Sequence, residues 1–333
     1  MKKLYLLMTV VAFATACKTG EIDEIPMLNP EISFEISEHL RVGENIKNLC
    51  LVNQKNYFYS VGANIIRVQN DQQTTFTASS EILSLAWNNA EAALYFGTHA
   101  SGLGCLKNGQ IHYFTESSHG LPRNLVRHVV CDSEGGVWFN TSAHLLGGLG
   151  YLQNNRVEIY TPQNSLLPDN LIKSIVCRDQ EIWVATGGYV TYQKVVKIAA
   201  GQWELLPVSG YYLMEMDVDT NGALNIIDDY GLSSSFSVTN HIINYTGKQT
   251  KILLPPSATR FSFYPYRLKS DRRNYLWVAK YSSPDAKRLI VYNGESWIEP
   301  PASFPDDFIN CIATDPQNRI WLGTTDGIYR LDQ

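Results

Sequence analysis

Residues 310–331 read NCIATDPQNRIWLGTTDGIYRL, and this stretch divides into three short apolar segments separated by polar turns. The first segment ends at Asp315, the second centres on Trp321, and the third follows Gly327. Each segment is about five residues long, the usual length of a sheet strand, and is bounded by turn residues. The stretch therefore predicts three successive β-strands.

The same phrase recurs along the chain at a regular interval. Successive markers lie 38 to 52 residues apart, and the marker positions are Tyr57, Tyr95, Trp138, Trp183, Asn225, Trp277 and Trp321. A second phrase with the same phase precedes three of the markers and begins at Leu121, Leu167 and Phe304. A period of about 40–50 residues built of four short strands is typical of a propeller blade. The chain is therefore predicted to be all-β, a seven-bladed β-propeller with four-stranded antiparallel blades.

The last copy stops at Gln333, after its third strand, so its fourth strand must come from elsewhere. Residues 31–37 alternate polar and apolar side chains, as a half-buried strand does. We expect this segment to pair with Ile328–Leu331 as the outer strand of the last blade, which removes the free sheet edges of an open ring. The predicted blades are 44–79, 80–120, 121–165, 166–210, 211–258, 259–303 and the segment from 304 onward. In the second blade we expect strands near 82–86, 94–97, 104–107 and 111–115.

The repeated residues have structural explanations. Large flat marker side chains suit the packing between neighbouring sheets. An Asp at the start of a turn accepts a hydrogen bond from the backbone two residues later, which is the role expected of Asp132, Asp219, Asp271 and Asp315. Each turn offers a single carboxylate, which is too few for a calcium ion. We therefore expect no metal and no cofactor.

These phrases together resemble a known family. Leu-Pro-x-Asn-x-Ile, an Asp-led turn, Trp-x-Gly-Thr and a following Gly-Ile strand are similar to the two-component regulator propeller repeat. That repeat builds the periplasmic sensor domains of hybrid histidine kinases in gut Bacteroidetes. The resemblance implies a propeller and a sensor-type or accessory role, here as a stand-alone lipoprotein. The architecture also resembles that of streptogramin lyases, which use His, Glu and a metal at the propeller mouth.

The N-terminus predicts export. A basic start, an apolar run and small residues precede Cys17, a pattern that resembles the bacterial lipobox. We expect residues 1–17 to be a signal peptide ending at a lipidated Cys17, residues 18–30 a tether, and residues 31–333 a single propeller domain. Ordinary cleavage beside an incidental cysteine is the alternative. The chain would then be anchored in the cell envelope through lipid alone, facing the periplasm from the outer membrane rather than the cell surface.

The net charge and the cysteine positions limit the classes of partner and of cross-link that we expect. The net charge of -5 and the lack of a basic stripe argue against nucleic acid. Apart from Cys17, four cysteines fall in predicted first strands and one in a third strand, and we interpret them as small buried thiols rather than a disulfide framework. They are Cys50, Cys131, Cys177, Cys311 and Cys105.

Candidate ligand residues follow from the loops. Loops between second and third strands and loops linking blades should meet at one mouth of the channel, where a scaffold positions functional side chains. The alternative for each residue is an ordinary solvated loop position. The candidates are His99, His144, Tyr189, Tyr192, Asp229, Tyr230, Lys280, Tyr281, Asp326, Arg123 and Tyr212.

The set is aromatic and mixed in charge, which suits a glycan fragment or a small polar ligand. We expect non-catalytic binding of such a ligand or of an envelope protein partner. Two alternatives remain open: a lyase or hydrolase with a His-based site near His99 and His144, with or without a metal, and a protein-interaction scaffold. No carboxylate beside these histidines completes an evident acid–base set.

Overall fold

The structure is a computed structural model that describes residues 32–143, 146–188, 192–229, 240–256, 263–281 and 287–333. Residues 33–333 form one compact unit of β-strands with a single four-residue helix, α1 (Glu116–His119), among the described residues. Within the same residues, no helix has the length and apolar character needed to cross a bilayer. The predicted signal peptide and tether lie outside the described part of the chain.

The strands form seven four-stranded antiparallel sheets. The first blade is β2 (Asn48–Asn53), β3 (Asn56–Val61), β4 (Asn64–Gln69) and β5 (Gln72–Thr77). The second is β6 (Ile82–Asn88), β7 (Ala93–Thr98), β8 (Leu103–Lys107) and β9 (Gln110–Phe114). The third is β10 (Val129–Cys131), β11 (Val137–Ala143), β12 (Leu146–Gln153) and β13 (Arg156–Tyr160). The fourth is β14 (Ile172–Arg178), β15 (Glu181–Thr186), β16 (Gln193–Ala199) and β17 (Gln202–Gly210).

The remaining three blades have the same order. The fifth is β18 (Leu213–Val218), β19 (Leu224–Asp228), β20 (His241–Tyr245) and β21 (Thr250–Leu253). The sixth is β22 (Pro265–Ser270), β23 (Leu276–Lys280), β24 (Leu289–Tyr292) and β25 (Trp297–Ile298). The seventh is β26 (Ile309–Thr314), β27 (Ile320–Thr324), β28 (Gly327–Leu331) and β1 (Ile36–Leu40). Every strand after β1 falls inside the blade predicted for it.

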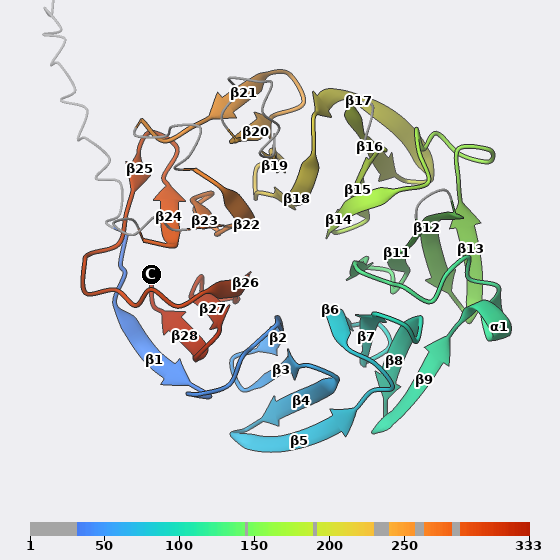
Figure 1. Cartoon of the computed structure of the whole chain (residues 1–333), viewed down its shortest axis with the longest axis horizontal. Coiled ribbons are helices and arrows are strands. Elements are labelled where there is room, and N and C mark those ends of the chain that lie inside the picture. The colour runs from blue at the N-terminus through green and yellow to red at the C-terminus, as the bar shows by residue number, and fades with distance from the viewer. Residues whose placement is uncertain (1–31, 144–145, 189–191, 230–239, 257–262, 282–286) are drawn as a thin grey trace, which may run out of the picture. The chain divides into compact units, whose positions relative to one another are not determined.

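The sheets stand around a central channel as a closed ring (Figure 1). The first strand of each blade lies innermost and contacts the first strands of both neighbours, and β26 of the last blade contacts β2 of the first. This arrangement confirms the predicted seven-bladed propeller. The four predicted strands of the second blade are confirmed to within two residues at each end, and the cysteines lie in first strands and, for Cys105, in a third strand. The five described cysteines are free.

The N-terminal strand closes the ring as predicted, but it lies farther along the chain than the sequence pattern indicated. β1 pairs antiparallel with β28, with Ile36 opposite Leu331 and Leu40 opposite Ile328. Residues 32–35 are outside the strand because Phe34 packs edge-on against two rings of the sixth and seventh blades instead. Its ring centroid lies 5.9 Å from that of Trp277 and 6.1 Å from that of Phe304. The predicted strand 31–37 is therefore corrected to 36–40.

The hydrophobic core lies between neighbouring blades. Trp138 packs into a cluster with residues of the fourth blade, Trp183 into one with the fifth, and Trp321 into one with Tyr57 and Tyr59 of the first. Because each sheet buries apolar side chains against the next one, the blades stabilise one another around the ring. The predicted role of the marker aromatics is confirmed at these positions.

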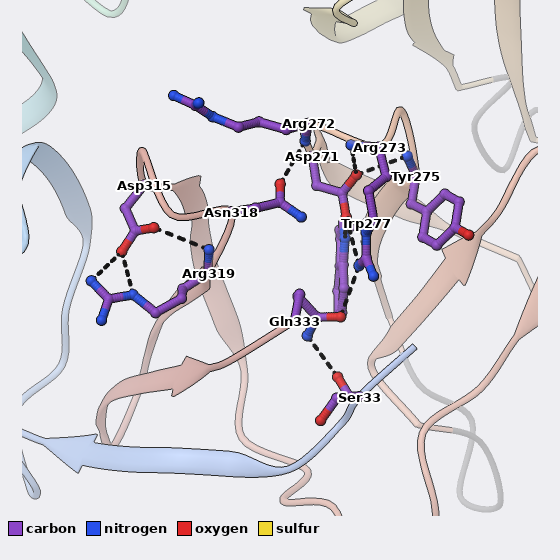
Figure 2. Close-up of polar contacts among 10 residues, drawn as sticks. All are labelled: Ser33, Asp271, Arg272, Arg273, Tyr275, Trp277, Asp315, Asn318, Arg319 and Gln333. Atoms are coloured by element: carbon purple, nitrogen blue, oxygen red, sulfur yellow. Dashed lines mark hydrogen bonds and ion pairs between the residues drawn. The ribbon is translucent and has the colours of Figure 1, made fainter. Parts of the chain in front are cut away.

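The Asp-led turns are confirmed, and they make more contacts than predicted. In the seventh blade, Oδ1 of Asp315 accepts hydrogen bonds from the backbone N–H of Gln317 (2.9 Å) and of Arg319 (3.0 Å). Its Oδ2 accepts from Nε1 of Trp321 at 3.0 Å and from Nε of Arg319 at 2.7 Å. Asp132 and Asp271 accept from Trp138 and Trp277 in the same way, at 3.0 and 3.3 Å. Figure 2 shows the turns of the sixth and seventh blades.

Neighbouring turns are also hydrogen-bonded to each other. The N–H of Arg272 donates to Oδ1 of Asn318 at 2.6 Å (Figure 2), and the N–H of Thr220 donates to Oδ1 of Asn274 at 2.8 Å. Corresponding bonds join the second to the third blade, the third to the fourth and the fourth to the fifth. We call this chain of contacts the turn belt. It links five consecutive blade boundaries on one side of the ring.

Antiparallel pairing gives the propeller two different faces. Turns that join first to second and third to fourth strands lie on one side, which carries the turn belt and which we call the turn face. Loops that join second to third strands, and linkers between blades, lie on the opposite side, the mouth face.

Candidate functional site

The structure places the described candidate residues on the mouth face. His99, Tyr192, Asp229, Tyr281 and Asp326 follow second strands or precede third strands, Lys280 ends β23, and Arg123 and Tyr212 lie in blade linkers. His144, Tyr189 and Tyr230 lie outside the described residues. The alternative of a His-based site near His99 and His144 therefore stays untested.

Asp326 and Lys280 have structural partners. Oδ1 of Asp326 accepts a hydrogen bond from the N–H of Gly43 at 2.8 Å, and its carbonyl oxygen lies 2.6 Å from Nε2 of His39, so Asp326 holds the ring closure. Lys280 is 3% exposed, and its Nζ lies 3.9 Å from Oε1 of Glu299. Burial lowers the pKa of Lys280, partly offset by the negative charge of Glu299.

The structure brings Tyr281 into an aromatic cluster with Tyr266 and Phe308, which we call the aromatic platform. Tyr266 and Phe308 stack with their ring planes 6° apart and centroids 4.8 Å apart, and Tyr281 lies 4.7 Å from Tyr266. Tyr281 is 52% exposed, whereas Tyr266 is buried, and burial raises the pKa of Tyr266 to about 12. The guanidinium of Arg288 lies 5.6 Å above Phe308. The platform therefore offers a supported aromatic surface with a cation at its edge.

Exposed apolar side chains gather on the mouth face. Among the described residues, those at mouth-face loops or strand ends are Val42, Leu146, Leu166, Tyr192, Tyr211, Leu254 and Tyr281. The other large exposed apolar side chains, Leu205 and Ile252, lie on the outer strands β17 and β21. None of this group lies in a described turn of the turn face. In the described loops, large exposed apolar side chains are therefore a feature of the mouth face.

Five of the first strands each have a β-bulge near the mouth face. In five blades the pairing of first and second strands skips residues just after the strand begins. Bulges redirect side chains and are frequent beside functional sites. The skipped residues are Leu83, Lys173, Met214, Glu215, Tyr266 and Asn310. In the third blade the backbone N–H groups of Arg127 and His128, just before β10, both donate to Oδ1 of Asn140 at 2.9 Å. We call the skipped residues, together with Arg127 and His128, the channel entrance.

Two ion pairs join the first strands of the fifth and sixth blades. Nη1 of Arg267 lies 3.2 Å from Oε2 of Glu215, and Nζ of Lys269 lies 2.5 Å from Oδ1 of Asp217. Burial raises the pKa of Glu215, and the charge of Arg267 opposes this. The sequence analysis did not predict these two ion pairs between β18 and β22. The signal was present, because both strands carry two like charges two residues apart at matching distances from the marker positions.

The fifth and sixth blades also depart from the repeat at a buried position. Three residues after the marker, the other blades carry Ser or Thr, whereas these two carry Asp228 and Lys280. Asp228 accepts hydrogen bonds from the backbone N–H of Tyr211 (2.8 Å) and Tyr212 (2.9 Å), and its Oδ2 lies 3.8 Å from Nε2 of His241. Burial raises the pKa of Asp228, against these hydrogen bonds and the charge of His241. Asp228 therefore fixes the linker that carries the candidate Tyr212.

A small pocket lies on the turn-face side. Residues of the fourth to seventh blades line a pocket of about 220 Å³, among them Lys269, Asp217 and Arg272. Its basic side chains, which include Arg178, are matched by as many aspartates, which include Asp219 and Asp271. Within the described residues, no three His, Cys, Asp or Glu side chains are grouped closely enough to hold a metal ion. The basic and acidic side chains of this pocket therefore balance one another, whereas the aromatic platform lies on the mouth face.

Comparison with known proteins agrees with the fold. A sequence model of the family described as "Two component regulator propeller" matches residues 303–326. A search of curated proteins finds no relative that matches the chain significantly.

Solved structures share the architecture at low identity. The extracellular domain of BT3049, a candidate hybrid two component system of B. thetaiotaomicron, superposes with a TM-score of 0.64 at 15% identity over 88% of this chain and 42% of that one. A streptogramin B lyase superposes with a TM-score of 0.64 at 14% identity over 88% and 95% of the two chains. PorZ, a surface component of the type-IX secretion system of Porphyromonas gingivalis, superposes with a TM-score of 0.65 at 12% identity over 90% and 48%.

The chain thus spans less than half the length of the BT3049 domain and of PorZ. At these identities the three structures agree with this chain in fold alone. The protein is a seven-bladed β-propeller, and residues 303–326, which lead into and form much of its last blade, match the sequence model of the two-component regulator propeller family.

Proposed function

We propose that this propeller is a non-catalytic binding protein that takes an oligosaccharide on its mouth face, at the aromatic platform. The observation that carries the proposal is the platform itself. Tyr281 is half exposed, yet its ring rests on Tyr266 and near Phe308, so little side-chain freedom remains to be lost on binding. The apolar faces of sugar rings stack on such surfaces, while their hydroxyl groups need polar neighbours. Arg288 and Asp306, 3.8 Å apart, provide them beside Phe308.

The test is binding of neutral and charged oligosaccharides, measured by titration calorimetry with the full mature chain. Tyr281→Ala removes the exposed ring, and we expect it to weaken binding by about tenfold or more, as loss of a buried aromatic contact does. Leu205→Ala is the matched control, because Leu205 is 49% exposed but lies on the outer strand β17. Equal affinities of the Tyr281→Ala variant and the parent chain would contradict the proposal.

The proposal includes export and a lipid anchor. The pattern before Cys17 supports cleavage at that residue, and the acidic segment 18–30 would act as a tether. Cys17→Ser should abolish incorporation of labelled palmitate and release the protein from the membrane fraction. Membrane association that survives this change would contradict the lipid anchor while leaving the binding site unaffected.

A protein partner is the second candidate. It is favoured by the spread of exposed aliphatic side chains around the mouth face, which a sugar would not cover. Val42, Leu146, Leu166 and Leu254 belong to this group. Replacing Leu146 and Leu166 together by Ser distinguishes the candidates, because it should abolish capture of a protein partner and leave oligosaccharide binding unchanged.

A further inference from the structure

The channel entrance carries more positive than negative charge, although the whole chain has a net charge of -5. Three permanent cations belong to residues at or directly beside it in the third, fourth and sixth blades, namely Arg127, Lys173 and Arg267. One carboxylate, that of Glu215, accompanies them among the described first-strand residues at this level. The opposite end of the channel is balanced, with three cations and three aspartates around its pocket.

Arg267 is held in a fixed orientation. Its Nε donates to the carbonyl oxygen of Asn310 at 2.8 Å, and its Nη1 donates to the carbonyl oxygen of Tyr266 at 2.9 Å and to Glu215 at 3.2 Å. Its Nη2 makes no hydrogen bond to any described residue. The side chain is 41% exposed. The two N–H groups of Nη2 on a positioned guanidinium are therefore available, and each can donate a charge-assisted hydrogen bond to an oxyanion.

Arg127 and Lys173 add two further positive charges at the channel entrance. Arg127 is exposed, and its guanidinium makes no hydrogen bond or ion pair with the described residues, because it is the backbone N–H of Arg127 that donates to Asn140. Lys173 lies with its Nζ 4.3 Å from the ring centre of Tyr212. His128 lies just before β10 of the third blade, and Arg267 lies in β22 of the sixth. Burial, together with the charges of Arg267 and Arg127, lowers the pKa of His128 to about 4.

We propose that the channel entrance binds an oxyanion group, a carboxylate or a sulfate ester, of a negatively charged oligosaccharide whose sugar rings lie on the aromatic platform. The inference rests on the proposed function and names the charge of the ligand. Platform and entrance are continuous, because Tyr266 belongs to both and its carbonyl oxygen accepts a hydrogen bond from Arg267. One ligand can therefore contact the ring of Tyr281 and Nη2 of Arg267 together.

The test compares three hexasaccharides by titration calorimetry at about pH 8, where a free carboxyl group is ionised. They are hexagalacturonate, its fully methyl-esterified and neutral form, and a sulfated maltohexaose. We expect hexagalacturonate, the sulfated hexamer or both to bind about tenfold or more tightly than the neutral ester, because charged groups strengthen hydrogen bonds to Arg. The tighter of the two charged hexamers identifies the anion.

Two variants change the charge at the entrance in opposite directions. Arg127→Gln should weaken binding of the charged hexamer by about fivefold, as removal of one exposed cation does. Glu215→Gln removes the competing carboxylate and should strengthen binding of the same probe, an effect that misfolding cannot imitate. Arg272→Gln, the same change on the turn face, is the matched control and should have no effect.

The outcomes distinguish failure of the anion site alone from failure of the whole proposed oligosaccharide site. Equal affinity for the charged and neutral hexamers, unchanged by Arg127→Gln and Glu215→Gln, would overturn the anion site and leave the aromatic platform as a neutral sugar site. Failure of all three hexamers to bind would overturn the oxyanion inference, and with it the proposed oligosaccharide site.

Discussion

The two faces of this propeller use polar residues for different purposes. On the turn face, Asp132, Asp271 and Asp315 each satisfy backbone and indole N–H groups inside their own blade, and the turn belt joins one blade to the next. On the mouth face, side chains differ from blade to blade, and large apolar ones remain exposed. A repeated residue that hydrogen-bonds its own backbone serves the fold, whereas a side chain found in one blade and exposed is available for a ligand.

The largest effect on stability should come from Asp315→Ala. This change removes the acceptor for two backbone N–H groups, for Nε1 of Trp321 and for the guanidinium of Arg319, which is 14% exposed. Loss of one partner of a buried ion pair costs about 3–5 kcal/mol. Urea denaturation should show a loss of that size, and a loss below about 1 kcal/mol would show that the turn contacts are not stabilising.

The same carboxylate predicts a dependence on pH. Burial alone would raise the pKa of Asp315, but hydrogen bonds from Arg319 and Trp321 and the charge of Arg319 hold it below its ordinary value of 3.8. The contribution to stability is therefore complete above about pH 4 and is lost as the pH falls through the folded-state pKa. Asp315→Asn should flatten the acid side of the stability profile, and an unchanged profile would contradict this assignment.

Asp219→Ala should have a smaller effect, although Asp219 begins an equivalent turn. Its Oδ1 accepts the backbone N–H of Asn221 (2.9 Å) and Ala223 (2.8 Å), but the marker position of this blade is Asn225 and supplies no indole. Arg178 contacts the carbonyl oxygen of Asp219 rather than its carboxylate. We expect a loss of about 1–2 kcal/mol in the same urea assay. A loss equal to that of Asp315→Ala would remove the distinction between the two turns.

Asn318→Ala tests the turn belt. The amide oxygen of Asn318 accepts the N–H of Arg272 across the boundary between the sixth and seventh blades. One partly exposed hydrogen bond contributes about 0.5–1.5 kcal/mol. The change should lower the free energy of unfolding by that amount and leave ligand binding unaffected. Altered binding would mean that the turn face also takes part in function.

Tyr281→Ala should have the smallest effect on stability, within about 0.5 kcal/mol, because the side chain is half exposed and neighbouring rings remain packed without it. The same variant should show the largest loss of oligosaccharide affinity. A thermal melt and a titration on one preparation check both expectations. Strong destabilisation would indicate that Tyr281 serves the fold.

Periodicity in the sequence was sufficient to predict the fold, because Trp, Asp and Pro positions recur at the spacing of one blade. The closing strand was predicted at the right edge but misplaced, since alternation at 31–37 could not reveal that Phe34 packs against Trp277. The predicted Asp turns carried a further signal, the constant separation of six residues between Asp and Trp, which reports their hydrogen bond.

The candidate site was less accessible to sequence reasoning. Loop position placed the described candidates on one face, but it could not separate Tyr281, which joins the platform, from Asp326, which holds the ring closure. The channel entrance was missed because it depends on bulges, which change the direction of a side chain without changing the hydrophobic pattern. Arg267 and Glu215 meet across a sequence separation of 52 residues, so their pairing appears only in the folded ring.

The separation of roles between the two faces is tested most directly by residue-resolved amide exchange of the intact chain, with and without a bound oligosaccharide. The account predicts added protection at the N–H groups of Tyr281 and Thr325, which donate to the mouth-face linkers at Tyr264 and Phe308. The N–H groups of Arg273 and Gln317, bonded to Asp271 and Asp315 on the turn face, should not change. Protection at Arg273 and Gln317 without protection at Tyr281 would contradict it.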